Sequence, residues 1–219
     1  MKRKIVLLAF TLTLILSLNV NAQEKNPWTT GVDLYSSYVW RGTKLGSGPA
    51  MQPTVKYTNG GFSIGGWGNY CFSTNEATES DLFTSYAVTL SKTSSLTFSL
   101  TDYYFPGATS PYFNGNSHYF EPQISLGLGK LSLSGAYMGN AQDTYLEAGY
   151  AAGNVTLFAG AGDGQYTKDA KFNLCNIGLK TGTAIKINDH FSIPVTGALI
   201  LNPSTEQFNI VVGITLANQ

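Results

Sequence analysis

Hydrophobic and polar residues alternate along most of the chain with a period of two. In the clearest stretch, Phe208, Ile210 and Val212 share one face of an extended chain, while Gln207 and Asn209 lie on the other. No stretch beyond residue 22 keeps the i, i+3, i+4, i+7 spacing of an amphipathic helix. The pattern predicts strands of about ten residues, the length that a tilted strand needs to cross a bilayer.

Twelve such runs are predicted, and the fold class is therefore all-β. They span residues 30–41, 50–58, 61–72, 80–91, 95–105, 117–128, 131–140, 143–152, 154–162, 171–186, 190–201 and 206–216. Alternation alone also fits a soluble β-sandwich, whose apolar faces would turn inward.

The connections between the runs favour a membrane barrel over a sandwich. Every second connection is tight and made of turn residues, such as Asn59-Gly60 and Gly129-Lys130. The others are mostly longer and polar, for example 42–49, 73–79 and 106–116. One rim of tight turns and one of long loops is typical of a single up-and-down antiparallel transmembrane β-barrel, with both termini periplasmic.

Aromatic residues cluster where the predicted strands approach the long connections. This set comprises Tyr38, Trp40, Tyr70, Phe72, Tyr103, Tyr104 and Phe105. Such a cluster predicts an interfacial aromatic girdle at that rim. The alternative is that these rings form the core of a sandwich.

The N-terminus has the three parts of a secretory signal peptide. Lys2, Arg3 and Lys4 precede an apolar run from Ile5 to Leu18, and small residues end at Ala22. The run is shorter than the ~20 residues of a transmembrane helix. We expect residues 1–22 to be removed and residues 23–219 to form one outer-membrane barrel domain.

Composition supports a membrane location and excludes some other functions. Thirteen basic and thirteen acidic residues cancel, so there is no positive field for nucleic acid. Charged residues make up 12%, about half of the usual share in soluble domains, which suggests that much of the surface does not face water. Cys71 and Cys175 are expected to be free thiols on opposite faces.

Short aromatic motifs resemble one known family. The segment 36–42, Ser-Ser-Tyr-Val-Trp-Arg-Gly, is similar to the opening motif of a family of small outer-membrane proteins described as TorF-like porins. Residues 61–68 resemble the second hairpin of that family, and residues 103–107 with 119–121 resemble its central pair. The motif departs after Arg-Gly, where Thr43-Lys44-Leu45 replaces the Ser-Gln common in the family. The resemblance implies an outer-membrane barrel with a porin-like role.

If the apolar faces contact lipid, ionisable residues on the alternate faces line the lumen and are candidates for function. These residues are Asp33, Arg41, Lys56, Glu121, Glu147 and Lys180. Asp33 and Lys56 are expected at the periplasmic ends of adjacent strands, where they could pair. One hypothesis is a constriction that selects solutes by charge; the other is a set of ion pairs that holds the lumen shut. Small inward residues such as Ser99 and Ser125 favour a narrow, wet pore.

Two other classes of function remain open. His190 and Ser192, with Glu206 downstream, could form the base, nucleophile and orienting residue of a lipid hydrolase. His190 is predicted at the periplasmic rim, however, and Glu206 at the opposite rim. The loop 106–116 could bind a partner outside the cell, or it could fold over or into the mouth of the barrel. His118 lacks partners at metal-ligand spacing.

The sequence thus predicts a narrow channel for passive diffusion of small hydrophilic solutes, with a non-conducting structural or surface-binding barrel as the alternative and the lipid hydrolase as a remote one. We expect no enzymatic activity, no cofactor and no metal ion. The expected partners are outer-membrane lipid, lipopolysaccharide and the solutes. Nucleic acid is excluded, and a homo-oligomer is left open.

Overall fold

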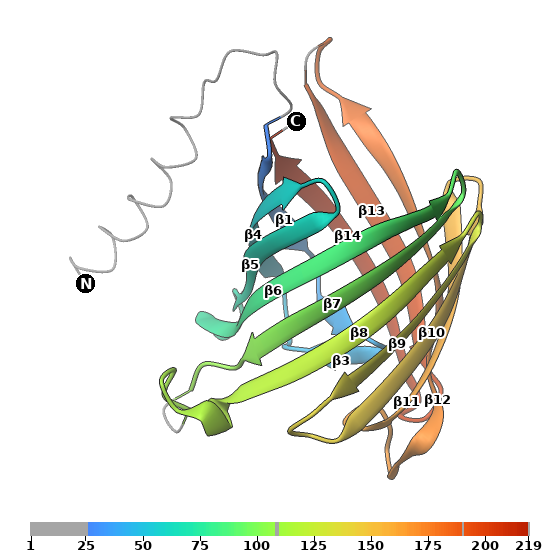
Figure 1. The fold of residues 1–219 in the computed structure, drawn as a ribbon. Coiled ribbons are helices and arrows are strands. Elements are labelled where there is room, and N and C mark those ends of the chain that lie inside the picture. Colours follow the sequence, from blue (N-terminus) through green and yellow to red (C-terminus); the bar gives the residue numbers. More distant parts are fainter. Residues whose placement is uncertain (1–25, 108–109, 190, 219) are drawn as a thin grey trace.

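Twelve strands form one closed antiparallel barrel in the computed structural model (Figure 1). The structure describes residues 26–107, 110–189 and 191–218, so the predicted signal peptide lies outside the described residues. The barrel strands are β1 (Trp28–Tyr35), β4 (Ala50–Asn59), β5 (Phe62–Cys71), β6 (Glu76–Ser91), β7 (Ser94–Tyr104), β8 (His118–Leu128), β9 (Leu131–Met138), β10 (Asp143–Ala152), β11 (Val155–Gly164), β12 (Ala170–Lys186), β13 (Ser192–Asn202) and β14 (Gln207–Ala217). Each pairs with its neighbours in the chain, and β1 pairs with β14 to close the sheet. The predicted twelve-stranded up-and-down barrel is confirmed.

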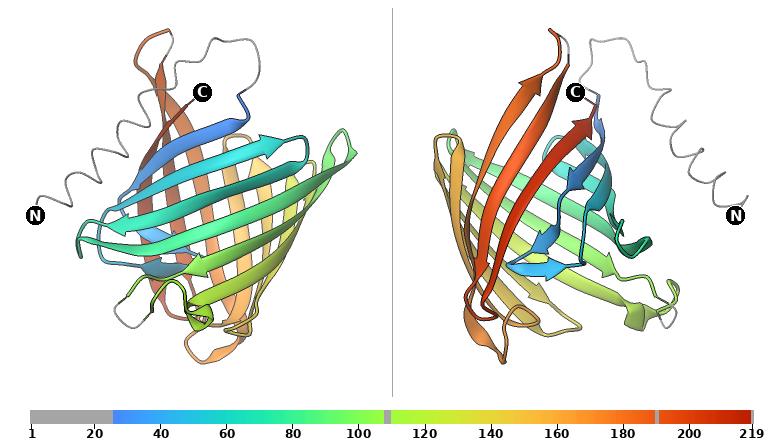
Figure 2. Two further views of the ribbon diagram at one scale, coloured as in Figure 1. Left: turned by 60° about the vertical axis from the view of Figure 1, so that its left-hand side comes forward. Right: turned by 180° about the vertical axis from the view of Figure 1, so that it is seen from behind.

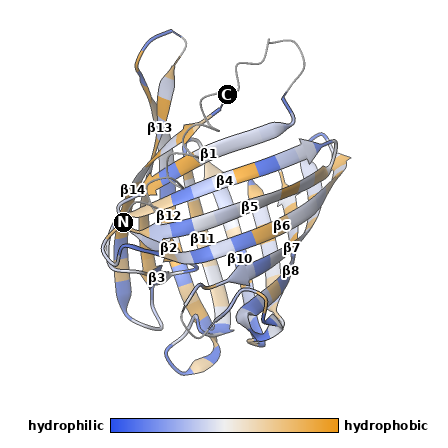
Figure 3. Ribbon diagram, turned by 90° about the vertical axis from the view of Figure 1, so that its left-hand side faces the viewer, coloured by the Kyte–Doolittle hydropathy of each residue, from blue (hydrophilic) through white to orange (hydrophobic). Residues whose placement is uncertain are grey.

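The period-two pattern sets the two faces of the barrel wall. Phe98 of β7 lies opposite Ile124 of β8, and their side chains are 47% and 52% exposed on the outer face. The next pair on the same strands, Thr97 and Ser125, faces the lumen. Figure 3 shows this alternation of hydrophobic and hydrophilic residues along the strands. The wall is therefore apolar outside and polar inside, as in a transmembrane barrel.

The two rims of the barrel differ as predicted. We call the end that carries the tight turns the turn rim; Gly60, Gly129 and Gly153 adopt positive φ angles of 58°, 63° and 67° there. The start of β1 and the C-terminal end of β14 lie at the same end (Figure 2). The opposite end, the loop rim, carries the longer connections. In the described part of the chain no helix has the length and hydrophobicity needed to span a membrane.

The first predicted strand, 30–41, is wrong in its second half. β1 ends at Tyr35, and the chain then leaves the wall to form β2 (Tyr38–Trp40) and β3 (Thr43–Leu45), which pair only with each other. Arg41 and Gly42 connect them, with φ angles of 49° and 82°. Two successive positive φ angles are the requirement of a tight type I′ turn. This inner hairpin, residues 38–45, lies within the barrel near the loop rim (Figure 2).

A β-bulge in β12 lies beside the tip of the inner hairpin. Gly160 pairs with Asn176 and Ala161 with Leu174, so Cys175 is an extra residue in the ladder. The bulge turns the Cys175 side chain inward, and it is fully buried. Cys71 is buried as well, and both are free thiols, as expected. The prediction that they face opposite sides is wrong, because the bulge shifts the alternation by one residue.

Candidate functional site

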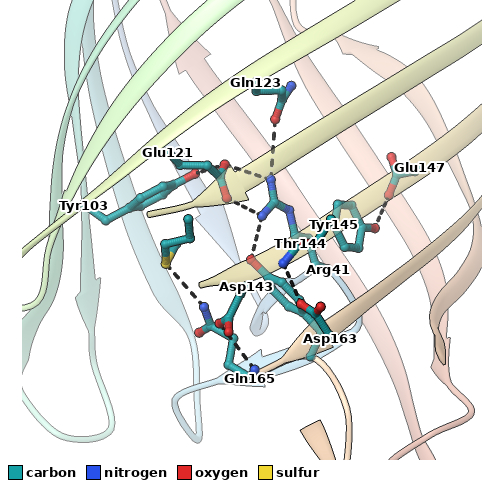
Figure 4. Close-up of polar contacts among 12 residues, drawn as sticks. Arg41, Tyr103, Glu121, Gln123, Asp143, Thr144, Tyr145, Glu147, Asp163 and Gln165 are labelled. Atoms are coloured by element: carbon teal, nitrogen blue, oxygen red, sulfur yellow. Dashed lines mark hydrogen bonds and ion pairs between the residues drawn. The ribbon is translucent and has the colours of Figure 1, made fainter. Parts of the chain in front are cut away.

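Arg41, at the tip of the inner hairpin, binds residues of the barrel wall. Its guanidinium donates two hydrogen bonds to the carboxylate of Glu121 on β8, at 2.6 and 2.8 Å. It also donates to the hydroxyl of Tyr166 at 2.6 Å and to the side-chain oxygen of Gln123 at 3.4 Å (Figure 4). Tyr166 lies in the connection between β11 and β12. We call Arg41, Glu121 and Tyr166 the arginine clamp.

Aromatic rings enclose the guanidinium. Its central carbon lies 4.6 Å from the ring centre of Trp40, 4.4 Å from that of Tyr145 and 5.4 Å from that of Tyr166. The side chains of Arg41 and Glu121 are only 9% and 2% exposed. Burial lowers the pKa of Arg41, but the hydrogen bond and the charge of Glu121 outweigh it and raise the pKa above its usual value. Arg41 therefore stays charged across the physiological pH range.

The backbone of the inner hairpin also fits closely against the wall. A Cβ atom at Gly42 would lie 2.0 Å from the carbonyl oxygen of Cys175, so only glycine can occupy this position. Trp40 packs against the buried cluster of Tyr145, Tyr166 and Cys175. The hairpin is thus seated on the β12 bulge and held by the clamp.

The six lumen residues predicted from the sequence divide into two groups. Arg41, Glu121 and Glu147 come together at the inner hairpin: the Glu147 carboxylate accepts hydrogen bonds from Tyr145 at 2.5 Å and Asn176 at 2.9 Å. The sequence had predicted Arg41 on a barrel strand, but Arg41 reaches this group from the turn of the inner hairpin.

The other three predicted residues lie nearer the turn rim. Asp33 on β1 is opposite Gln52 and accepts a hydrogen bond from Thr215, whereas Lys56 is opposite Thr29. The expected Asp33–Lys56 pair is therefore not formed. Lys180 lies on β12, with its side chain exposed.

The sequence reasoning missed two carboxylates on β6. Glu79 and Asp81 face the lumen and are 3% and 7% exposed. Neither forms an ion pair within the described residues, and Oδ1 of Asp81 has no hydrogen-bond partner there. The predicted strand began at residue 80, which left Glu79 in a loop. The Glu79-Ser80-Asp81 spacing was the available signal, because it puts both acids on one face of a strand.

Part of the predicted aromatic girdle lies inside the barrel. Tyr38 packs on Trp67 at 5.6 Å and Trp40 on Tyr103 at 5.5 Å between ring centres. Tyr103 is 9% exposed. These three girdle candidates, Tyr38, Trp40 and Tyr103, surround the inner hairpin, whereas Phe72 is 51% exposed near the loop rim.

The loop 106–116 does not enter the lumen in its described part. Phe113 is 99% exposed, and the ring of Tyr112 packs on His118 at 5.1 Å. His118 faces outward, with Nδ1 3.0 Å from the Asp102 carboxylate and Nε2 2.5 Å from the carbonyl oxygen of Tyr112. The connection that enters the barrel is the first one, and not this loop.

The described residues do not assemble the hydrolase constellation. His190 lies outside the described residues. Ser192 begins β13 at the turn rim, and Glu206 precedes β14 at the loop rim, so one strand length separates them. Within the described residues no group of three His, Cys, Asp or Glu side chains is placed to hold a metal ion.

Comparison with known proteins gives the fold and a family. A solved structure of the KdgM porin in complex with disordered oligogalacturonate is 10% identical, with a TM-score of 0.50, covering 88% of this chain and 99% of that one. A second KdgM porin structure gives 10% identity, a TM-score of 0.49 and coverage of 87% and 99%. The outer membrane protein OprD from Pseudomonas aeruginosa is 12% identical, with a TM-score of 0.35 and coverage of 90% and 67%.

At such low identity, these likenesses concern the barrel fold alone. No curated protein matches the chain. Residues 21–190 match the model of a family described as a bacterial protein of unknown function (Gcw_chp), and the chain belongs to this family.

Proposed function

We propose that this protein is an outer-membrane channel for passive diffusion of small hydrophilic solutes, narrowed near the loop rim by the inner hairpin. The observation that carries the proposal is the opposite polarity of the two faces of a closed sheet. An apolar outer wall is unfavourable in water and favourable in lipid. The polar groups of the inner wall need water or a solute as hydrogen-bonding partners. Removal of residues 1–22 after export, periplasmic termini, kinship with TorF-like porins and contact with lipopolysaccharide belong to the same proposal.

The wall of the barrel leaves room that the inner hairpin takes up. Eight strands enclose an interior just filled by side chains, and sixteen enclose an open channel, so twelve lie between. Small residues such as Ser99, Ser125 and Ser134 face the lumen on β7, β8 and β9. Trp40, Tyr103, Tyr145 and Tyr166 gather with the arginine clamp around the hairpin, while the inward rings of Phe83 and Phe158 lie nearer the turn rim. The hairpin, which adds backbone as well as side chains to the lumen, is therefore the main structure that restricts passage.

Single-channel recording in planar bilayers tests this proposal. We expect small conductance steps from the wild type and larger steps from a variant in which residues 37–47 are replaced by a short Gly-Ser linker. Shortening the loop 106–116 is the matched control, because the described part of this loop lies outside the lumen and its loss should leave the conductance unchanged. Circular dichroism and heat-dependent migration in gels confirm that each variant is folded.

Each outcome has a distinct meaning. If neither the wild type nor the hairpin variant conducts, the channel function is rejected. If both conduct equally, the hairpin does not restrict the pore. Liposome swelling with sugars, amino acids and nucleosides of graded size then gives the size limit of the solutes.

A second candidate, a barrel closed at rest, is favoured by the burial of the arginine clamp. The ion pair between Arg41 and Glu121 is 9% and 2% exposed, so water has little access to it. In that case the wild type gives no conductance steps in the bilayer, whereas the variant without the hairpin conducts. The same recordings therefore separate the two candidates.

A further inference from the structure

The charged side chains of the lumen are unequally divided between the two signs. The inner wall carries the carboxylates of Asp33, Glu79, Asp81, Glu121, Asp143 and Glu147. The basic groups of the inner wall and the inner hairpin are Arg41, Lys44, Lys56 and Lys180. Carboxylates therefore predominate although the whole chain is neutral.

The excess of negative charge lies beside the inner hairpin. Arg41 and Glu121 neutralise each other in the clamp. Four carboxylates remain around the hairpin, those of Glu79, Asp81, Asp143 and Glu147, and none forms an ion pair within the described residues. Lys44 is the one basic residue of the hairpin outside the clamp, and Lys56 and Lys180 lie farther toward the turn rim. Within the described residues, carboxyl groups therefore outnumber basic groups around the hairpin.

Glu79 and Asp81 are buried carboxylates with no basic side chain paired to them in the described structure. They are two residues apart on one face of β6, opposite Asn69 on β5 and Tyr103 on β7 respectively. Asp81 is 7% exposed, and its Oδ1 atom has no donor in the described structure. A buried carboxylate oxygen without a donor or a counter-charge is costly. A cation in the lumen would supply the positive charge that the described residues do not place beside this pair.

The surroundings of this pair offer further oxygen atoms. The side-chain amide of Gln52 donates to Oδ1 of Asn69 at 3.1 Å, and Asn69 donates to the hydroxyl of Thr78 at 2.7 Å. These bonds fix the amides and leave carbonyl and hydroxyl oxygens along β4, β5 and β6. Rings of carboxylates and oxygens favour the passage of cations through a pore, because they lower the energy of a positive charge that has lost part of its hydration shell.

We infer that the pore passes small monovalent cations, inorganic or organic ammonium, in preference to anions, and that Glu79 and Asp81 determine this preference. The inference rests on the proposed channel function and names its solute class. The arginine clamp contributes no net charge, so the preference comes from the β6 pair and its neighbouring acids.

The test is the reversal potential of single channels in a tenfold KCl gradient, repeated with tetramethylammonium chloride. We expect the wild type to reverse on the cation-selective side. The double variant Glu79→Gln/Asp81→Asn keeps the shapes of the side chains and removes both charges, so the ratio of cation to anion permeability should fall several-fold. Asp169→Asn is the matched control, because Asp169 is 55% exposed outside the lumen and pairs with Lys171. It should leave the ratio unchanged.

Selectivity and conduction are separate readouts. Absence of conductance in every sample would reject the channel itself. Conductance with a wild type that prefers anions, or with a double variant as selective as the wild type, would overturn the inference and leave the channel intact. If the double variant does not fold, the wild type at decreasing pH replaces it: protonation of the carboxylates should reduce cation selectivity, and selectivity that is constant down to pH 3 would contradict the inference.

Discussion

Arg41 occupies a backbone conformation that its residue type disfavours. A left-handed conformation costs roughly 1–2 kcal/mol for a residue other than glycine, and Arg41 has a φ angle of 49°. Asn or Gly would be the usual choice in such a turn. An asparagine could not replace Arg41, because the forked guanidinium donates one hydrogen bond to each oxygen of the Glu121 carboxylate. The strain is therefore offset by the clamp and points to a function for the residue.

Replacing Glu121 by Gln should loosen the inner hairpin without unfolding the barrel. The change leaves the charge of Arg41 buried and uncompensated, which costs about 3–5 kcal/mol in comparable cases. We expect hydrogen exchange of the amides in residues 38–45 to accelerate by two or more orders of magnitude, while the barrel strands remain protected. Glu76→Gln, an exposed site on β6, is the control. Equal protection of residues 38–45 in both variants would show that the ion pair does not hold the hairpin.

Alternation along the strands correctly predicted the inward direction of Glu121 and Glu147, because every strand of a barrel in lipid must separate the two faces. It could not predict the partners of Arg41. Those partners come from β8 and from the connection after β11: Glu121 is 80 positions and Tyr166 is 125 positions away in the sequence. Contacts at such distances depend on the closure of the whole sheet, which no local pattern encodes.

At the scale of elements, the local sequence pattern did not predict the inner hairpin. Residues 38–41 continue the first predicted run and residues 42–49 resemble a polar connection, and the Arg41-Gly42 turn is not one of the common Asn-Gly or Asp-Gly pairs. The bulge at Cys175 was equally invisible, because one extra residue in a ladder leaves the composition of the strand unchanged. The two irregularities meet, since the carbonyl of Cys175 faces Gly42.

Substitution of Gly42 by Ala should therefore displace the hairpin tip. The new Cβ would meet the Cys175 carbonyl oxygen at 2.0 Å, and the φ angle of 82° is unfavourable for alanine. Gly60→Ala is the matched control, because its φ angle is 58° and nothing lies within 4 Å of the added atom. We expect Gly42→Ala to raise single-channel conductance and Gly60→Ala to leave it unchanged. The same conductance in both would mean that the tip is not seated as described.

The outer loop 106–116 should be ordered by His118. Both ring nitrogens of His118 face acceptors, the carboxylate of Asp102 and the carbonyl of Tyr112, and only the protonated imidazolium can donate to both at once. We expect the loop to resist proteolysis below pH 6 and to become more sensitive as the pH rises and the ring loses its proton. His118→Phe should remove this pH dependence. A loop whose cleavage rate is the same at pH 5 and pH 8 would contradict the assignment.

At the scale of the whole molecule, the strand number and the two unequal rims were predictable because lipid imposes one rule on every strand. The outer wall must be apolar throughout, so the period of two persists along the entire barrel. Which connection enters the lumen was not predictable by the same rule. The rule concerns the outside of the wall, whereas filling of the lumen depends on how individual side chains such as Trp40 and Tyr166 fit together.

An arginine introduced on the outer face should destabilise the barrel far more than one introduced on the inner face. Leu100 of β7 is 44% exposed outside, whereas the adjacent Ser99 faces the lumen opposite Gln123. We expect Leu100→Arg to lower the free energy of unfolding in lipid vesicles by about 2–4 kcal/mol, and Ser99→Arg to lower it much less. Urea titration followed by tryptophan fluorescence measures both. Equal effects would indicate that the outer wall does not contact hydrocarbon.

The inner hairpin is attached to the wall at both ends, and this limits how it can move. Ser36 exchanges backbone and side-chain hydrogen bonds with Val212, and the Ser47 hydroxyl lies 2.9 Å from that of Ser73. Four residues of extended chain reach at most about 14 Å, so 46–49 cannot carry the hairpin across the barrel to the turn rim. The tip is held as well, by the hydrogen bonds of Arg41 and by the close approach of Gly42 to Cys175. A segment fixed at both ends and at its tip cannot swing aside like a hinged lid while these contacts are intact.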